Sequence, residues 1–102
     1  MSLLSVNDND KDICFSGLKH RLFIEGRGFD FRMFKILNDG SAKLELAGPE
    51  DLLYTLLDFE EPRVIYVVSR LGYKELILQG CIIKEINGDA CSLYYSKLQL
   101  ES

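Results

Sequence analysis

The sequence predicts a mainly β protein: a six-stranded antiparallel small barrel of the split type with one short helical insertion. Three observations predict this fold class. Most apolar segments are short and alternate with polar residues, as residues 29–37 do. Turn sequences rich in Gly, Asn and Asp separate these segments, and Asn87-Gly88 is the strongest hairpin signal among them. Helical spacing of apolar residues is confined to residues 49–57.

The first three strands are expected over residues 18–25, 29–37 and 41–46. Between the first two, Glu25-Gly26-Arg27-Gly28 supplies glycines for a hairpin turn. Asn38-Asp39-Gly40 supplies the next turn, because Asn and Asp tolerate positive φ and Gly adopts it freely. The first two strands are therefore expected to pair as a hairpin, with the third returning beside them.

The helical insertion is expected over residues 49–57. Pro49 suits a first helical position, and Glu50 and Asp51 favour the positive end of the helix dipole. Residues 62–69 return to strand and include a β-branched run that is apolar on both faces, which is typical of a central strand.

The last two strands are expected over residues 74–86 and 90–98, joined at Asn87-Gly88. The first of them is longer than an ordinary strand, and Gly80 near its middle is where a bulge or bend would fall. One strand bent at Gly80 is therefore expected, and hairpin-sized turns predict a meander that curls into a barrel.

A core follows from these strands and their alternation, although a slip of one residue would invert a strand's faces. The residues expected in it are Phe29, Phe31, Leu44, Leu46, Leu56, Val64, Tyr66, Val68, Leu76, Leu78, Ile82 and Leu93.

Composition limits the classes of protein. The 102 residues are 47% hydrophobic, enough for one globular domain over residues 13–102. Residues 1–12 are rich in Asn and Asp and are expected to be a flexible acidic arm. The net charge of −4 argues against a general nucleic-acid binder. Neither a leader peptide nor a long apolar span is evident, so no membrane insertion and a cytoplasmic location are expected.

Residues for catalysis or metal binding are scarce. His20 is the single histidine, and no Ser or Cys occurs in a known nucleophile motif. The three cysteines are widely spaced and match neither a disulfide framework nor a zinc motif. Cys81 and Cys91 lie in apolar runs and are expected to be small buried residues. The sequence therefore predicts a protein that is not an enzyme and has no metal or other cofactor.

Basic residues concentrate in one stretch of the first half. Two interpretations stay open: a site for an anionic ligand, or the solvated outer face of two strands. The residues are Lys19, His20, Arg21, Arg27, Arg32 and Lys35.

A resemblance to PilZ domains begins at residue 35. Residues 41–49, Ser-Ala-Lys-Leu-Glu-Leu-Ala-Gly-Pro, resemble the strand after the signature loop of these six-stranded barrels, which bind cyclic di-GMP in bacterial signalling. The strand around Gly80-Cys81-Ile82-Ile83 and the final strand, which ends at Leu98, fit the same plan. The resemblance thus covers about residues 18–98. The resemblance implies a dinucleotide site made of arginines before the barrel and an Asp/Asn-x-Ser-x-x-Gly loop.

This sequence departs from the PilZ pattern at both motifs. Arg27 and Arg32 are five residues apart where the family has four. With Asp39 and Ser41 in the loop motif, Leu44 stands where the glycine belongs. With Ser41 at the glycine position instead, Ile36 and Asn38 take the acidic and serine positions, so either register loses part of the site. The predicted anionic-ligand site is therefore Arg27, Arg32, Asn38, Asp39 and Ser41, with binding of cyclic di-GMP expected to be weak or absent. The resemblance implies a degenerate PilZ-like adaptor whose partner is a protein.

A second family is similar to the same pattern. Residues 49–85 are similar to the first barrel of phage tail hubs and type VI secretion spikes, in which such barrels belong to longer chains. The alternative function is a structural β-barrel subunit of a tail-like or secretion-like assembly. Dinucleotide binding tests the first function, and copurification of tail or spike proteins tests the second.

Overall fold

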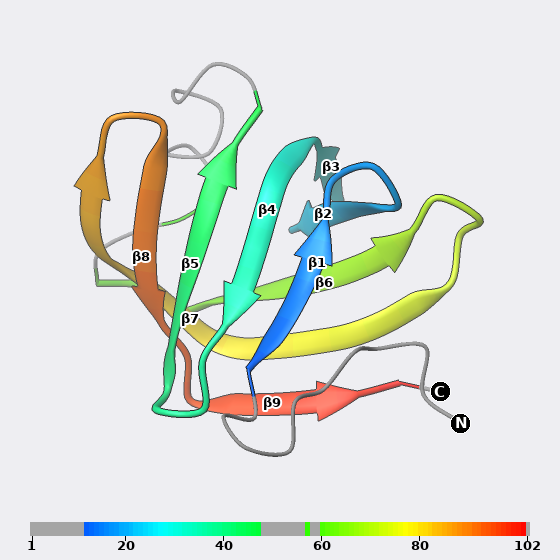
Figure 1. Ribbon diagram of the computed structural model, residues 1–102. Coiled ribbons are helices and arrows are strands. Elements are labelled where there is room, and N and C mark those ends of the chain that lie inside the picture. The colour runs from blue at the N-terminus through cyan, green and yellow to red at the C-terminus, as the bar shows by residue number, and fades with distance from the viewer. Residues whose placement is uncertain (1–11, 48–56, 58–59, 102) are drawn as a thin grey trace.

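The computed structural model describes residues 12–47, 57 and 60–101 of the chain. The strands follow one another in a single antiparallel hydrogen-bonded order that bends into two sheets (Figure 1). The two ends of this order do not pair, so the arrangement is not closed. Its strands are β1 (Ile13–Ser16), β2 (His20–Ile24), β3 (Arg27–Phe29), β4 (Phe31–Ile36), β5 (Ser41–Leu46), β6 (Arg63–Ser69), β7 (Lys74–Asn87), β8 (Ala90–Tyr94) and β9 (Lys97–Leu100). The mainly β prediction is thus confirmed, as an open arrangement and not as a closed barrel.

Strand β7 belongs to both sheets. Its second half pairs with β8 in a sheet of order β1-β4-β5-β8-β7, here called sheet A. Its first half pairs with β6 and β9 in sheet B, which continues through β2 to β3. Figure 1 shows β7 as one long curved strand. The prediction of a single strand bent at Gly80 is confirmed, since Gly80 has a φ of +72° inside β7.

Two predicted strands are divided in the structure. Residues 29–37 hold the end of β3, which pairs with β2 in sheet B, and all of β4, which pairs with β1 and β5 in sheet A. The expected hairpin is confirmed only over β2 and the short β3, because the chain crosses between sheets at Asp30 and the rest of the predicted second strand pairs in sheet A. Residues 90–98 likewise hold β8 in sheet A and the start of β9 in sheet B. These crossings, together with β1, raise the count from six predicted strands to nine described ones.

The core lies between the two sheets. Seven of the residues predicted for it are buried: Phe29, Phe31, Leu44, Leu46, Leu76, Leu78 and Leu93. The prediction is wrong for Val64, Tyr66 and Val68, which lie on the outer face of β6, whereas Ile65 and Val67 are its core residues. Ile82 is also wrong: beyond the bend at Gly80, Cys81 and Ile83 face inward.

In β4, the burial of alternate residues is also shifted by one position from Met33 onward. A β-bulge between Phe31 and Met33 breaks the alternation, so Phe34 is buried and Met33 is exposed. The predicted helix over residues 49–57 lies outside the described residues except for Leu57, which is buried. Leu56 and nearly all of the predicted acidic arm, residues 1–11, also lie outside them.

Candidate functional site

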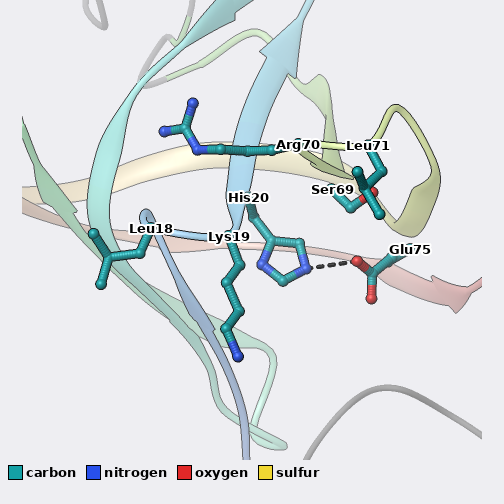
Figure 2. A pocket seen from close by; sticks show the side chains of 7 residues that line it. All are labelled: Leu18, Lys19, His20, Ser69, Arg70, Leu71 and Glu75. Carbon is teal, nitrogen blue, oxygen red and sulfur yellow. Dashed lines mark hydrogen bonds and ion pairs between the residues drawn. The ribbon is translucent and has the colours of Figure 1, made fainter.

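A pocket of about 470 Å³ opens between the turn that joins β1 to β2 and the turn that joins β6 to β7. Figure 2 shows the side chains around it. Its lining residues are Leu18, Lys19, His20, Ser69, Arg70, Leu71 and Glu75. Residues far apart in the sequence thus meet here because β2 and β6 are neighbours in sheet B.

Two strands place a polar pair at the inner end of this pocket. His20 precedes Leu22 and Ile24 by the strand period of two, so it lies on the core-facing side of β2. Glu75 lies in a β-bulge of β7: Val67 pairs with Leu76 and Val68 with Lys74, which leaves Glu75 without a register partner. The bulge turns this carboxylate inward toward the histidine.

The contact between the two side chains is short and largely removed from water. His20 Nε2 lies 2.6 Å from Glu75 Oε2, and the side chains are 13% and 10% exposed. Glu75 is the one buried charged residue among those described. Because buried charges require partners, the imidazole is what makes this carboxylate tolerable at the end of the core.

The other side of the imidazole has no polar partner. The Phe15 ring packs edge-on against it, with 4.9 Å between ring centroids. His20 Nδ1 is buried and has no hydrogen-bond partner in the described part of the chain. In Figure 2 this nitrogen lies on the side of the ring away from Glu75. The pair therefore leaves one buried polar atom, His20 Nδ1, without a partner among the described residues.

Two leucines form the rim of the pocket. Leu18 and Leu71 are 87% and 85% exposed, on turns that pass on either side of the opening. Isolated exposed leucines are ordinary, but two of them flanking one pocket form an apolar entrance.

The two turns are fixed to each other by Arg70. Its backbone N–H donates to Lys19 O at 2.9 Å. Its guanidinium Nη2 donates to Gly17 O at 2.8 Å and to Asp30 Oδ1 at 3.2 Å. The rim is therefore held in place before any ligand arrives, which lowers the ordering cost of binding.

Among the described residues, no nucleophilic side chain is hydrogen-bonded to His20 or Glu75. Ser69 is the cross-strand partner of His20, but its hydroxyl accepts a hydrogen bond from Tyr73 N at 3.1 Å. No group of three or more His, Cys, Asp or Glu residues in the described ranges is placed to hold a metal ion.

The structure separates the residues of the predicted anionic-ligand site. Arg27 begins the edge strand β3 of sheet B, whereas Arg32 is near the start of β4 in sheet A. The turn of Asn38 and Asp39 lies at the far end of β4, six or seven residues from Arg32, which is about 20 Å along a strand. Only the turn residues and Ser41 are brought together.

These predicted residues also have partners of their own. The Arg32 guanidinium forms an ion pair with Asp89. Asp39 Oδ1 accepts hydrogen bonds from Ser41 Oγ at 2.6 Å and Ser41 N at 3.0 Å, and this hydrogen bonding lowers the pKa of Asp39. Such a side-chain contact two residues along the chain is ordinary turn chemistry.

The cysteines are free, and two of them are inert by position. Burial raises the pKa of Cys81 to about 12 and that of Cys91 to about 11. The thiolate is the reactive form of cysteine, so neither residue is a nucleophile near neutral pH. Their prediction as small buried residues is confirmed, and Cys14 is exposed.

Sequence reasoning missed Leu18, Leu71 and Glu75. For the leucines a signal exists, because each adjoins a glycine in a turn, where a large apolar residue has no core to enter. For Glu75 no such signal exists, since its inward orientation comes from a bulge that the sequence does not mark.

Comparison with known proteins found no match: no family model matches the chain, and no curated protein or solved structure is significantly similar to it. Among the described residues, no helix has the length and hydrophobicity required to cross a membrane. The pocket and the faces of the two sheets are therefore the basis for a function.

Proposed function

We propose that the protein is a non-catalytic adaptor module, as degenerate PilZ-like domains are, and that it binds a protein partner at the pocket between Leu18 and Leu71. The observation that carries this proposal is the pair of highly exposed leucines on two mutually fixed turns. An apolar side chain of the partner would enter between them and displace water from both. Burying a leucine-sized side chain contributes about 1.5–3 kcal/mol, so such an anchor dominates a small interface.

The charge at the rim favours an acidic partner segment. Lys19 lines the pocket and has no ion-pair partner among the described residues. Arg70 lies beside it, with half of its side chain accessible and one carboxylate, Asp30, already bound. A partner with Asp or Glu next to its apolar anchor would complement these two cations and associate faster at low salt.

A selection from a phage-displayed library of random linear peptides tests this proposal. We expect enriched peptides to combine a bulky apolar residue with neighbouring Asp or Glu. Changing Leu71 to Asp should weaken their binding at least tenfold, because a carboxylate at the entrance repels the acidic flank and removes apolar contact. Titration calorimetry with one synthetic peptide measures the loss.

The matched control is Met33→Asp. Met33 is also an exposed apolar residue, but it lies on β4 in sheet A and is not one of the residues that line the pocket. This variant should bind the peptide like the unaltered protein. Peptides that bind equally well to the Leu18→Asp, Leu71→Asp and Met33→Asp variants would contradict the proposed site.

For cyclic di-GMP we expect weak or no binding by calorimetry. The separation of Arg27, Arg32 and the turn at Asn38 supports this expectation, because a phosphate grip requires guanidinium groups that converge. Any affinity that remains should depend on the two arginines and should not be rescued by lysine. Tight binding that is unchanged in Arg27→Ala and Arg32→Ala would contradict this assignment of the dinucleotide site.

The second candidate function is a structural β-subunit of a tail-like or spike-like assembly. One observation favours it: Phe23, Tyr66 and Ile77 are only partly buried and lie on the outer face of sheet B. Interfaces of permanent assemblies resemble a domain core and carry such residues. Open-ended growth of oligomers in sedimentation velocity would support this function over the adaptor.

A further inference from the structure

The outer face of sheet B is apolar, unlike the outer face of sheet A. In sheet B, Phe23 pairs with Tyr66, and Tyr66 with Ile77, so the three form a row across β2, β6 and β7 on the side opposite the core residues Leu22 and Val67. The equivalent row in sheet A passes through Lys35, Lys43 and Ser92. A solvated antiparallel sheet face is normally polar, which describes sheet A and not sheet B.

The row belongs to a wider apolar patch. On β6, Val64 and Val68 flank Tyr66 at the strand period of two. A hollow of about 380 Å³ lies beside it, lined by Phe23, Tyr66 and Val68 with Gly26, Gly72 and Lys74. The Phe23 ring lies over Gly28, where a Cβ would come within 2.8 Å of the ring. The patch therefore extends over several strands of sheet B.

The two ends of this patch have opposite charge. At one end the Arg21 guanidinium lies 5.6 Å from the Phe23 centroid, and Lys74 Nζ lies 4.9 Å from the Tyr66 centroid. Arg21 shares the single carboxylate of Asp30 with Arg70, so this end keeps an excess of positive charge. At the other end Glu25 and Glu61 share the single cation Arg63, at 2.7 Å and 3.4 Å. Along β2, Arg21 precedes Phe23 by two residues and Glu25 follows it by two.

From this arrangement we propose that the outer face of sheet B binds a second copy of the chain, as a two-fold symmetric dimer. The axis lies in the interface and crosses the strands along the row of Phe23, Tyr66 and Ile77. Each β2 then lies antiparallel over the β2 of the other copy, so that Arg21 of either copy faces Glu25 of the other. The apolar row packs on its own counterpart.

Charge favours this occupant. A partner of uniform charge would match one end of the patch and oppose the other, whereas a second copy rotated by 180° matches both. The five strands of sheet B are about 4.8 Å apart and three to seven residues long within that sheet, so its face presents roughly 400 Å². Two such faces bury roughly 800 Å² in total, the size of a weak interface whose occupancy depends on concentration. This inference is independent of the pocket at His20.

Sedimentation equilibrium of the full chain over a range of concentrations tests the dimer, with circular dichroism to show that each variant is folded. In a dimer of Arg21→Glu, the new carboxylate of each copy faces Glu25 of the other copy. In a dimer of Glu25→Lys, the new cation of each copy faces Arg21 of the other copy. We expect each variant to dimerise at least tenfold more weakly than the unaltered protein. Lys43→Glu, on the outer face of sheet A, is the matched control and should dimerise normally.

Mixing the two variants gives the decisive measurement. In a mixed dimer, the new glutamate at position 21 of the first variant faces the new lysine at position 25 of the second. The unchanged Arg21 of the second variant faces the unchanged Glu25 of the first. An equimolar mixture should therefore restore dimers that neither variant forms alone. A protein that is monomeric at every concentration would overturn the proposal, as would variants that dimerise normally or a mixture that stays monomeric.

Discussion

Replacing His20 with Leu is expected to destabilise the protein by about 3–5 kcal/mol, because it leaves the Glu75 carboxylate buried without a partner. The change adds no cavity of consequence, since leucine and histidine are similar in size, and Phe15 can pack against either. Nearly all of the loss should thus come from the unpaired polar group. Urea unfolding followed by circular dichroism measures it as a lower transition midpoint at unchanged slope.

The double variant His20→Leu and Glu75→Leu separates this cause from general disruption. Removing both members of a buried pair is often neutral or stabilising, so the double variant should regain most of the stability that the single variant loses. The coupling free energy from the complete cycle should be at least about 2 kcal/mol. Additive losses would show that the two side chains act separately, contrary to the short contact between them.

Replacing Gly80 with Ala is expected to cost about 2–4 kcal/mol, the other large effect. A side chain at a φ of +72° is strained by about 1–2 kcal/mol. In addition, the new Cβ would lie 2.1 Å from Ser96 Oγ and 2.9 Å from Ser96 Cβ, so β7 and the segment before β9 must move apart. Packing adjustments of this kind add a further 1–3 kcal/mol or so.

Two controls divide the Gly80 effect into its parts. Gly26 has a φ of +82° with nothing within 4 Å of its ideal Cβ, so Gly26→Ala should show the backbone strain alone. Adding Ser96→Gly to Gly80→Ala removes the side chain that the new Cβ meets and should recover the difference. Equal destabilisation by Gly80→Ala and Gly26→Ala in urea unfolding would mean that the contact with Ser96 is unimportant.

Apart from β1, the strand segments are readable from the sequence, but strand faces are readable only where one face is polar. In β5, Lys43 and Glu45 alternate with Leu44 and Leu46, and the predicted face is correct. In β6 both faces are apolar, so the residues themselves do not say whether Ile65 or Tyr66 turns inward. Pairing with β2 decides it, and that is a long-range property.

The points where the chain changes sheets were not readable either. Asp30 looks like the polar member of an alternating strand, yet it marks the crossing from sheet B to sheet A. The candidate site depends on the same long-range geometry. His20 was visible as the single histidine, but Glu75 reaches it through a bulge, and Leu18 and Leu71 become neighbours only when β2 and β6 pair. Motif spacing instead favoured Arg27 and Arg32, which fold onto different sheets.

The position of β7 has a consequence for synthesis on the ribosome. Until residues 74–94 have emerged, β5 lacks its partner β8 and β6 lacks its partner β7. The pairings among β1 to β6 fall into two separate groups, β1-β4-β5 and β2-β3-β6, which β7 and β8 then connect. Because β7 pairs in both sheets, we expect its central amides to exchange with solvent only when the whole domain opens.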